Sequence, residues 1–467
     1  MSHSRSLPLV SVSIAIGALP ALAVPTQQAT AATGSQSQQD LTAPPQGAGA
    51  QEQLKPAQQG APLPPQGPIS QAAGQPNPQG TVFQTPGMPN MGLRISSGMG
   101  QVTRFSNEFN PAFSFIIDAA AEAVDSDSGR DGLDAELRSL ELSGNAWIDP
   151  RAWAYFVGVV EDETLNLEEA AIHYIGLGSR NTIRAGRFFI DFGKQMQIHV
   201  HELRTLERPL ALRTYLGSEV KGEGAQWDSW TTVGDSTAVR WSIGAFANAL
   251  AEIEEDDVTP TSPLIETLSP RTGEDFTYTA RLTGFTDVGE RGIFQLGASA
   301  RTLPRYELQY GDGAGSAGDD LSNTVFGLDA TYGWVGPTGV DSWSAGIELL
   351  ANVGDNGAEI TDPNGTPGDG DDVVALFDDT VYGGFAWVDY AWDRFNAVGL
   401  QYSTVELPDA NKSNVSEIEA YYTHMFSEFH RLRFVLALND SDIDGESSRF
   451  VVQYTAVLGA HGHGVNW

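Results

Sequence analysis

Two pairs of histidines with the same spacing are the residues best suited to chemistry. His199 and His201 are followed directly by Glu202, and His461 and His463 lie near the end of the chain. On an extended segment, side chains two residues apart point the same way, and imidazole nitrogens are ligands for Zn²⁺, Cu²⁺ or Ni²⁺. If the two segments approach each other, four imidazoles and Glu202 could surround one ion, with zinc the leading candidate. The alternative is that both pairs are unrelated polar residues.

Acidic segments rich in glycine form a second group of candidate ligands. Asp440, Asp442 and Asp444 have the spacing of the first half of an EF-hand loop, but the position that needs Glu is Val451. Residues 362–372 are also rich in Asp and Gly. Calcium could bind at either segment, although we favour hydrated acidic turns.

The sequence contains no arrangement typical of an enzyme nucleophile. The patterns G-x-S-x-G and H-E-x-x-H and the phosphate-binding P-loop are missing, and the chain has no cysteine. We therefore predict that the protein is not an enzyme.

Acidic residues dominate the composition. The chain has 60 Asp and Glu residues against 26 Lys and Arg residues, a formal net charge of −34. Such a surface repels nucleic acid and attracts cations. Nucleic acid is therefore excluded as a partner.

The first 95 residues differ from the rest of the chain. Residues 1–23 have a short apolar core and end in Ala-Leu-Ala, as a secretory signal peptide does. Residues 24–95 are rich in Pro, Gln and Gly, which predicts a disordered linker. The linker could be a simple spacer, which we favour, or a periplasmic tether or partner-binding segment. The remainder, 96–467, is expected to form one domain.

Sixteen segments of roughly ten residues alternate between apolar and polar side chains across this domain. In one of them Phe326 and Leu328 share a face opposite Asp329 and Thr331. Segments of about ten alternating residues are what a transmembrane β-barrel strand requires. The segments are 111–120, 134–147, 153–161, 165–175, 182–193, 223–231, 239–249, 276–287, 292–302, 323–334, 342–353, 380–391, 396–406, 415–426, 430–439 and 448–458.

The connections between these segments distinguish a membrane barrel from a soluble sandwich. Every second connection is short, whereas those between are often long: 121–133, 194–222, 250–275, 303–322, 354–379 and 440–447. Alternating long loops and short turns are typical of bacterial outer-membrane barrels. The sequence thus predicts an all-β, antiparallel, transmembrane barrel of about sixteen strands, in contact with outer-membrane lipid.

One block of the chain resembles the phosphate-selective porin O and P family. The likeness covers about 45 residues and consists of a strand, a long loop with a Glu-Arg-Pro-Leu core and a second strand. The matching residues are Ala185, Gly186, Phe188, Phe192, Gly193, Glu207, Arg208, Pro209, Leu210, Gly222, Gly224 and Ala225. The resemblance implies a sixteen-stranded barrel, a homotrimer and a third long loop, here 194–222, that folds inward as a constriction.

The charge of the chain departs from that family. Anion selection there is associated with rows of arginine and lysine, whereas this chain has only four lysines. Phosphate specificity is therefore not carried over. The residues expected to line the constriction are Lys194, His199, His201, Glu202, Arg204, Arg208 and Arg213.

These observations predict a porin-like channel that lets small solutes or ions diffuse passively across the bacterial outer membrane. One alternative is a channel that binds or takes up a divalent metal such as zinc. The other is a structural protein, in which a non-conducting barrel anchors the linker.

Overall fold

The computed structural model describes residues 112–459, except for residues 128–130, 162–163, 179, 248, 250–262, 267–270, 311–315, 362–372 and 428. All of them belong to the second of two compact units, Ser70–Trp467. The predicted signal peptide and linker lie outside the described residues. So do His461, His463 and the acidic segment 362–372.

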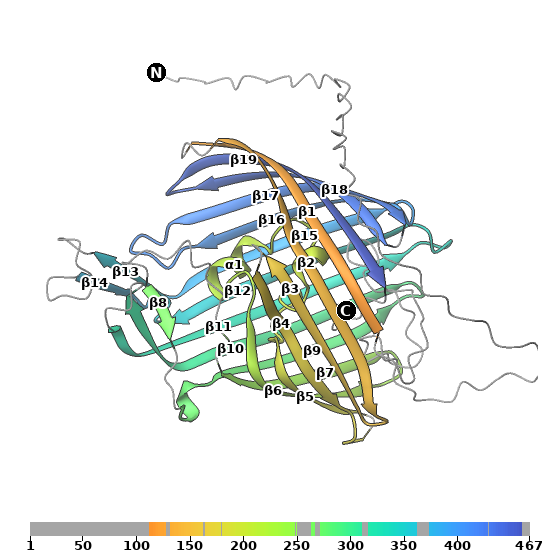
Figure 1. Cartoon of the computed structure of the whole chain (residues 1–467), viewed down its shortest axis with the longest axis horizontal. Helices are drawn as coiled ribbons and strands as arrows, with labels where there is room; N and C mark the ends of the chain where they lie inside the picture. Colours follow the sequence, from red (N-terminus) through yellow and green to blue (C-terminus); the bar gives the residue numbers. More distant parts are fainter. Residues whose placement is uncertain are drawn as a thin grey trace, which may run out of the picture. The chain divides into compact units, whose positions relative to one another are not determined.

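Sixteen antiparallel strands form one closed barrel (Figure 1). Each strand pairs with its neighbours in chain order, and β1 closes the ring by pairing with β19. The strands of the ring are β1 (Ala112–Ser126), β2 (Gly132–Asp149), β3 (Ala152–Glu161), β4 (Thr164–Tyr174), β5 (Asn181–Phe189), β6 (Lys221–Val233), β7 (Thr237–Ala247), β9 (Thr277–Val288), β10 (Gly292–Tyr310), β11 (Ser316–Val335), β12 (Ser342–Gly354), β15 (Val381–Ala391), β16 (Asn396–Glu406), β17 (Asn414–Ser427), β18 (His430–Ser441) and β19 (Gly445–Gly459).

Three further short strands lie outside the ring order. β8 (Pro263–Glu266) pairs with one end of β10, and β13 (Gly357–Thr361) and β14 (Val373–Phe377) form a separate hairpin. The described helical segments are α1 (Leu210–Leu216) and two 3-10 turns, η1 (Val200–Glu202) and η3 (Gly273–Asp275). None of the helices in the described residues is long and apolar enough to cross a membrane.

Each predicted segment corresponds to one strand of the ring, so the sixteen-strand barrel is confirmed. Three of the predicted long connections are wrong, namely 121–133, 303–322 and 440–447. Most of their residues belong to strands, because the flanking strands continue to pair beyond the predicted ends. β5 is instead shorter than predicted, so the third long-side connection is 190–220 rather than 194–222.

The two faces of the barrel have the polarity of a membrane protein. On β1, Phe113 and Phe115 are exposed on the outside, while Ser114 and Asp118 are buried on the inside. β11 repeats the pattern, with Leu328 outside and Asp329 inside. Only a closed barrel or a helix can satisfy its backbone hydrogen bonds within lipid. A polar interior with an apolar exterior therefore indicates a transmembrane barrel of the outer-membrane type.

Candidate constriction loop and metal centre

The connection between β5 and β6, residues 190–220, lies inside the barrel and is called the inner loop below. Gly193 sets its entry, because its φ of +54° is a conformation that favours glycine. A Cβ atom there would collide with the carboxylate of Glu348 on β12. The loop therefore enters the lumen in direct contact with the wall.

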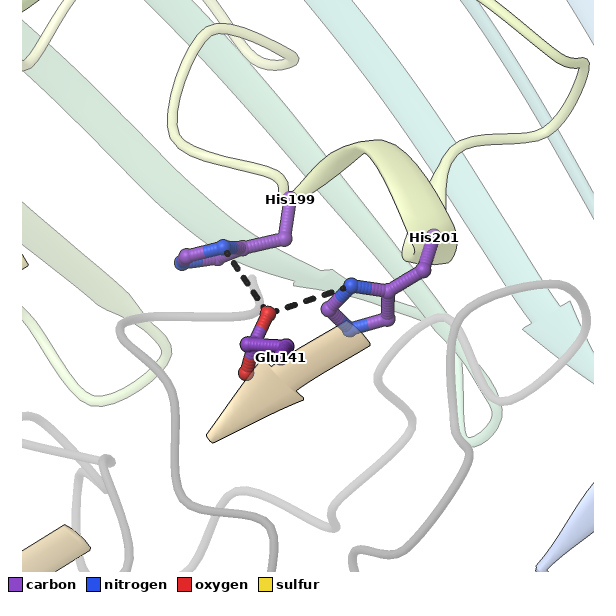
Figure 2. A group of neighbouring side chains, drawn as sticks. All are labelled: Glu141, His199 and His201. Carbon is purple, nitrogen blue, oxygen red and sulfur yellow. Dashed lines mark ion pairs between the residues drawn. The ribbon is translucent and has the colours of Figure 1, made fainter. Parts of the chain in front are cut away.

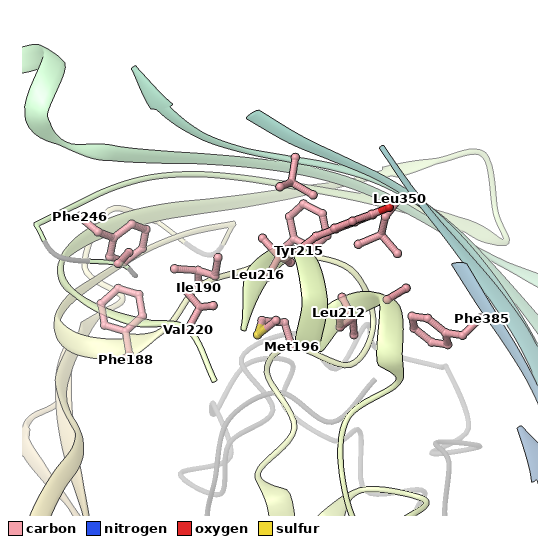
Figure 3. Close-up of a cluster of buried hydrophobic side chains, with 14 of the residues drawn as sticks. Phe188, Ile190, Met196, Leu212, Tyr215, Leu216, Val220, Phe246, Leu350 and Phe385 are labelled. Carbon is pink, nitrogen blue, oxygen red and sulfur yellow. The ribbon is translucent and has the colours of Figure 1, made fainter. Parts of the chain in front are cut away.

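Apolar side chains hold α1 against the wall of the barrel. Figure 3 shows Tyr215 and Leu212 facing the inward-pointing Leu350 of β12 and Phe385 of β15. All four residues are buried. Complete burial of a Leu side chain contributes about 1.5–3 kcal/mol. Burial of these apolar side chains therefore stabilises the position of the loop in the lumen.

Buried polar contacts fix the same side of the loop. The ammonium group of Lys194 donates to Gln295 at 3.0 Å, and its backbone N–H donates to Glu348 at 3.0 Å. The Arg204 guanidinium donates to Asp389 at 2.8 Å and lies over the ring of Trp387. Buried charges need partners of this kind, since an unpaired charge in such a place is costly.

Two inward arginines of β18 bind the loop backbone. The guanidinium of Arg431 donates to the carbonyl oxygen of His201, and that of Arg433 donates to the carbonyl oxygens of Leu203 and Thr205. Both arginines are completely buried. They satisfy carbonyl groups of a loop segment that contains little regular structure.

The predicted constriction residues all belong to the inner loop. Six of them are buried: Lys194, His199, His201, Glu202, Arg204 and Arg208. Arg208 donates to backbone carbonyls of the loop itself, at Ser218 and Met196. Arg213 is about a quarter exposed and pairs with Glu417 of β17 at 3.2 Å. These side chains hold the loop in place, and their contact with a passing solute stays a prediction.

His199 and His201 converge on a carboxylate that the sequence did not single out (Figure 2). Glu141 of β2 places Oε2 3.6 Å from His199 Nδ1 and 3.4 Å from His201 Nδ1. One potential ligand atom from each of the three residues lies within 4.8 Å of the others, and all three residues are buried. Glu202 does not belong to this group among the described residues. The predicted partner histidines, His461 and His463, lie outside the described residues.

Three buried carboxylates lie close to the ring nitrogens of His199. Burial alone would lower the pKa of His199, but ion pairs with Glu168, Glu169 and Glu141 outweigh burial and raise that pKa well above its usual value. The neighbouring carboxylates therefore favour the protonated form of His199. An imidazole must lose that proton to coordinate a metal.

The EF-hand-like segment forms a tight turn between β18 and β19. The carboxylate of Asp442 accepts a hydrogen bond from the backbone N–H of Asn414 at 2.8 Å. The hydroxyl of Ser441 accepts from the N–H groups of Ile443 and Asp444. These bonds close the turn without an ion, and calcium binding stays a prediction.

Sequence reasoning missed every wall residue of the site, including Glu141, Glu168 and Glu169. Strand parity could have indicated that Glu141 faces the lumen. It could not have indicated this for both Glu168 and Glu169, which are consecutive residues of β4 and are both buried where the register with β3 shifts. Parity alone gives no distance between strands, so it could not have indicated which of them meets His199.

No protein-family model matches the chain, and no curated protein matches it by sequence. Solved structures with similar folds include the anion-selective porin from Comamonas acidovorans, at 13% identity, covering 75% of this chain and 99% of that one, with a TM-score of 0.49. The outer membrane channel DcaP of Acinetobacter baumannii is similar at 12% identity, 75% and 97% coverage and a TM-score of 0.47. The in-vitro folded outer membrane protein OmpT of Vibrio cholerae, in its trimer form, is similar at 8% identity, 75% and 99% coverage and a TM-score of 0.47.

Proposed function

We propose that this protein is an outer-membrane channel through which small solutes or ions diffuse passively. The observation that carries the proposal is the inner loop, which is fastened within a closed barrel whose interior is polar. A barrel that served only as an anchor would have no need of a loop fixed across its lumen. A loop at this position restricts the size and charge of what passes.

The charge of the chain supports a preference for cations. Inward-facing residues carry both signs, but many are paired, as Arg281 is with Asp329 and Arg240 with Asp191. Paired charges largely cancel at a distance, so the acidic excess of the whole chain dominates the long-range field. We expect this field to raise the concentration of cations at the mouths of the barrel.

We also propose that the protein is related to the phosphate-selective porin O and P family and that it forms a homotrimer. The glycines that carry the resemblance to the phosphate-selective porin O and P family include Gly186 and Gly224, which lie opposite each other in register on β5 and β6. A Cβ atom at either would collide with the backbone of the next strand. This local packing supports kinship with that family, and with it a homotrimer. Native mass spectrometry of the detergent-solubilised protein tests the trimer, and a monomeric mass would contradict it.

Planar-bilayer recording tests the channel itself. We expect the purified protein to show discrete openings. In asymmetric KCl its reversal potential should have the sign of a cation-selective channel. Lower selectivity at high salt is also expected, because salt screens the field. Persistent silence of a correctly folded barrel would contradict the proposal and favour the non-conducting tether.

A further inference from the structure

We propose that Glu141, His199 and His201 bind a divalent transition-metal ion, with Zn²⁺ best suited, and that this ion fastens the inner loop to the barrel wall. The ligands combine two imidazole nitrogens with one carboxylate oxygen, a set that zinc accepts readily. Binding does not depend on the proposed channel activity. Only the effect of the ion on conductance rests on that proposed function.

The distances between the donor atoms fit a metal ion better than direct hydrogen bonds. Hydrogen bonds between nitrogen and oxygen span about 2.7–3.2 Å. A tetrahedral zinc ion with bonds of about 2.0–2.1 Å separates its ligand atoms by about 3.3–3.4 Å. Here Glu141 Oε2 lies 3.4 Å from His201 Nδ1 and 3.6 Å from His199 Nδ1. Both distances from the carboxylate oxygen are therefore close to the separation that one bound ion would impose, and the ligand atoms of the whole group lie within 4.8 Å of one another.

A second layer of residues orients His199 for this role. Its Nε2 lies 2.9 Å from Glu169 Oε1, and the hydroxyl of Tyr155 donates to Glu169 Oε2 at 2.5 Å. When the Nε2–H donates to Glu169, the lone pair of the neutral ring lies on Nδ1, the atom that lies 3.3 Å from Glu168 Oε2 and 3.6 Å from Glu141 Oε2. Carboxylates that orient metal-binding histidines in this way are a general feature of metal sites.

Buried negative charge gives the ion an electrostatic reason to bind. Glu141, Glu168 and Glu169 are all buried within the reach of His199. The ammonium group of Lys221, 3.8 Å from Glu168, is one compensating charge. A divalent cation would add to the cations that already pair with these carboxylates, and such pairing offsets part of the cost of burying them. Glu168 Oε2 lies 3.3 Å from His199 Nδ1, so a second carboxylate contacts the same nitrogen.

The position of the site defines its consequence. Glu141 belongs to the barrel wall, whereas both histidines belong to the inner loop. Glu141 lies on β2, the second of the sixteen strands, whereas β15, which contacts α1, is the twelfth, so six steps round the ring separate them. The ion would therefore hold the side of the loop that α1 does not.

Zinc titration of the full-length protein in detergent, after treatment with a chelator, tests the site. The background carries His461→Ala and His463→Ala, which removes the other closely spaced pair. We expect one zinc ion per chain in this background, none at this site in Glu141→Gln, and binding weakened about 10–100-fold in Glu169→Gln. His424→Gln, on β17, is the control and should bind zinc normally.

Each outcome is informative. Zinc binding that is unchanged by Glu141→Gln, or that disappears in the background alone, would overturn the proposal. If Glu141→Gln does not fold, Co²⁺ added to the background protein decides, because a four-coordinate site gives strong visible absorption and its absence would refute the site. In bilayers, zinc should lower the conductance of the background protein but not of Glu141→Gln. A silent barrel that still binds zinc would refute the channel and leave the metal site supported.

Discussion

At the scale of single residues, Arg204 shows how the inner loop is held. Its guanidinium pairs with Asp389, whose carboxylate also accepts hydrogen bonds from Ser344 at 3.2 Å and Tyr421 at 2.5 Å. Every donor in this group comes from a different element. The loop is thus fixed by a buried network, in which the loss of one member leaves the others without a partner.

Replacement of Arg204 by Ala should loosen the loop and raise the single-channel conductance. The change leaves Asp389 buried without its cation, which costs about 3–5 kcal/mol. In the Asp389→Asn background the same change should cost less, so a double-mutant cycle of unfolding free energies reports the coupling. Arg394→Ala, at an exposed turn position, is the control. Equal costs in both backgrounds would contradict the network.

Gly193→Ala tests the entry of the loop. The new methyl group adopts an unfavourable φ, at about 1–2 kcal/mol, and also meets the Glu348 carboxylate. Gly339→Ala is matched, because Gly339 has a φ of +70° but open space around its Cβ position. We expect a larger loss of stability at Gly193 by chemical denaturation. Equal losses of stability would show that the contact with Glu348 does not contribute to the effect.

At the scale of elements, the inner loop combines an apolar helix with charged ends. Burial would raise the pKa of Glu207, but Arg213 and Arg449 outweigh burial and lower that pKa to about 2. Because the ordinary value is 4.5, the folded loop favours the ionised form. This stabilisation is complete above pH 4.5 and is lost as the pH falls towards 2.

Acidification below pH 4.5 should therefore release this part of the loop. Hydrogen exchange of the loop amides should increase between pH 4.5 and 2.5 relative to the strands. Glu207→Gln should weaken the loop at neutral pH and reduce the further effect of acid, whereas Glu290→Gln, in an exposed turn, should behave as the parent does. An unchanged acid response in Glu207→Gln would refute this role.

At the scale of the whole molecule, the position of the strands could be predicted well from the sequence. Polarity alternates in segments such as 323–334 because one face of the strand meets lipid and the other meets the lumen. This pattern is local to each strand, so it can be recognised in the sequence. Of the metal group only the two histidines could be predicted, because they lie two residues apart in the sequence, whereas Glu141 reaches them only in the folded barrel. The ends of β10 and β11 were missed, because the two strands continue to pair beyond the residues whose polarity alternates between the lipid face and the lumen face.

Because the outer face of the barrel is apolar and its interior polar, a charged residue introduced on the outer face should lower the stability of the protein in lipid. Leu328→Arg should lower the stability in lipid by about 2–4 kcal/mol if the residue lies near the middle of the membrane. Val340→Arg is the control, because Val340 is an exposed apolar residue in the turn between β11 and β12. Unfolding by denaturant in liposomes measures both. Equal costs would contradict the assignment of the outer face to lipid.

The partners of the inner loop also set an order of events during assembly. His201 and Leu203 receive their hydrogen bonds from Arg431 and Arg433, which are about 230 positions further along the chain. Asp389, the partner of Arg204, is likewise synthesised much later than the loop. Contacts so distant in sequence form late, because the chain between them must first be ordered. A partial barrel that lacks β15 to β19 therefore leaves His201, Leu203 and Arg204 of the inner loop without these partners.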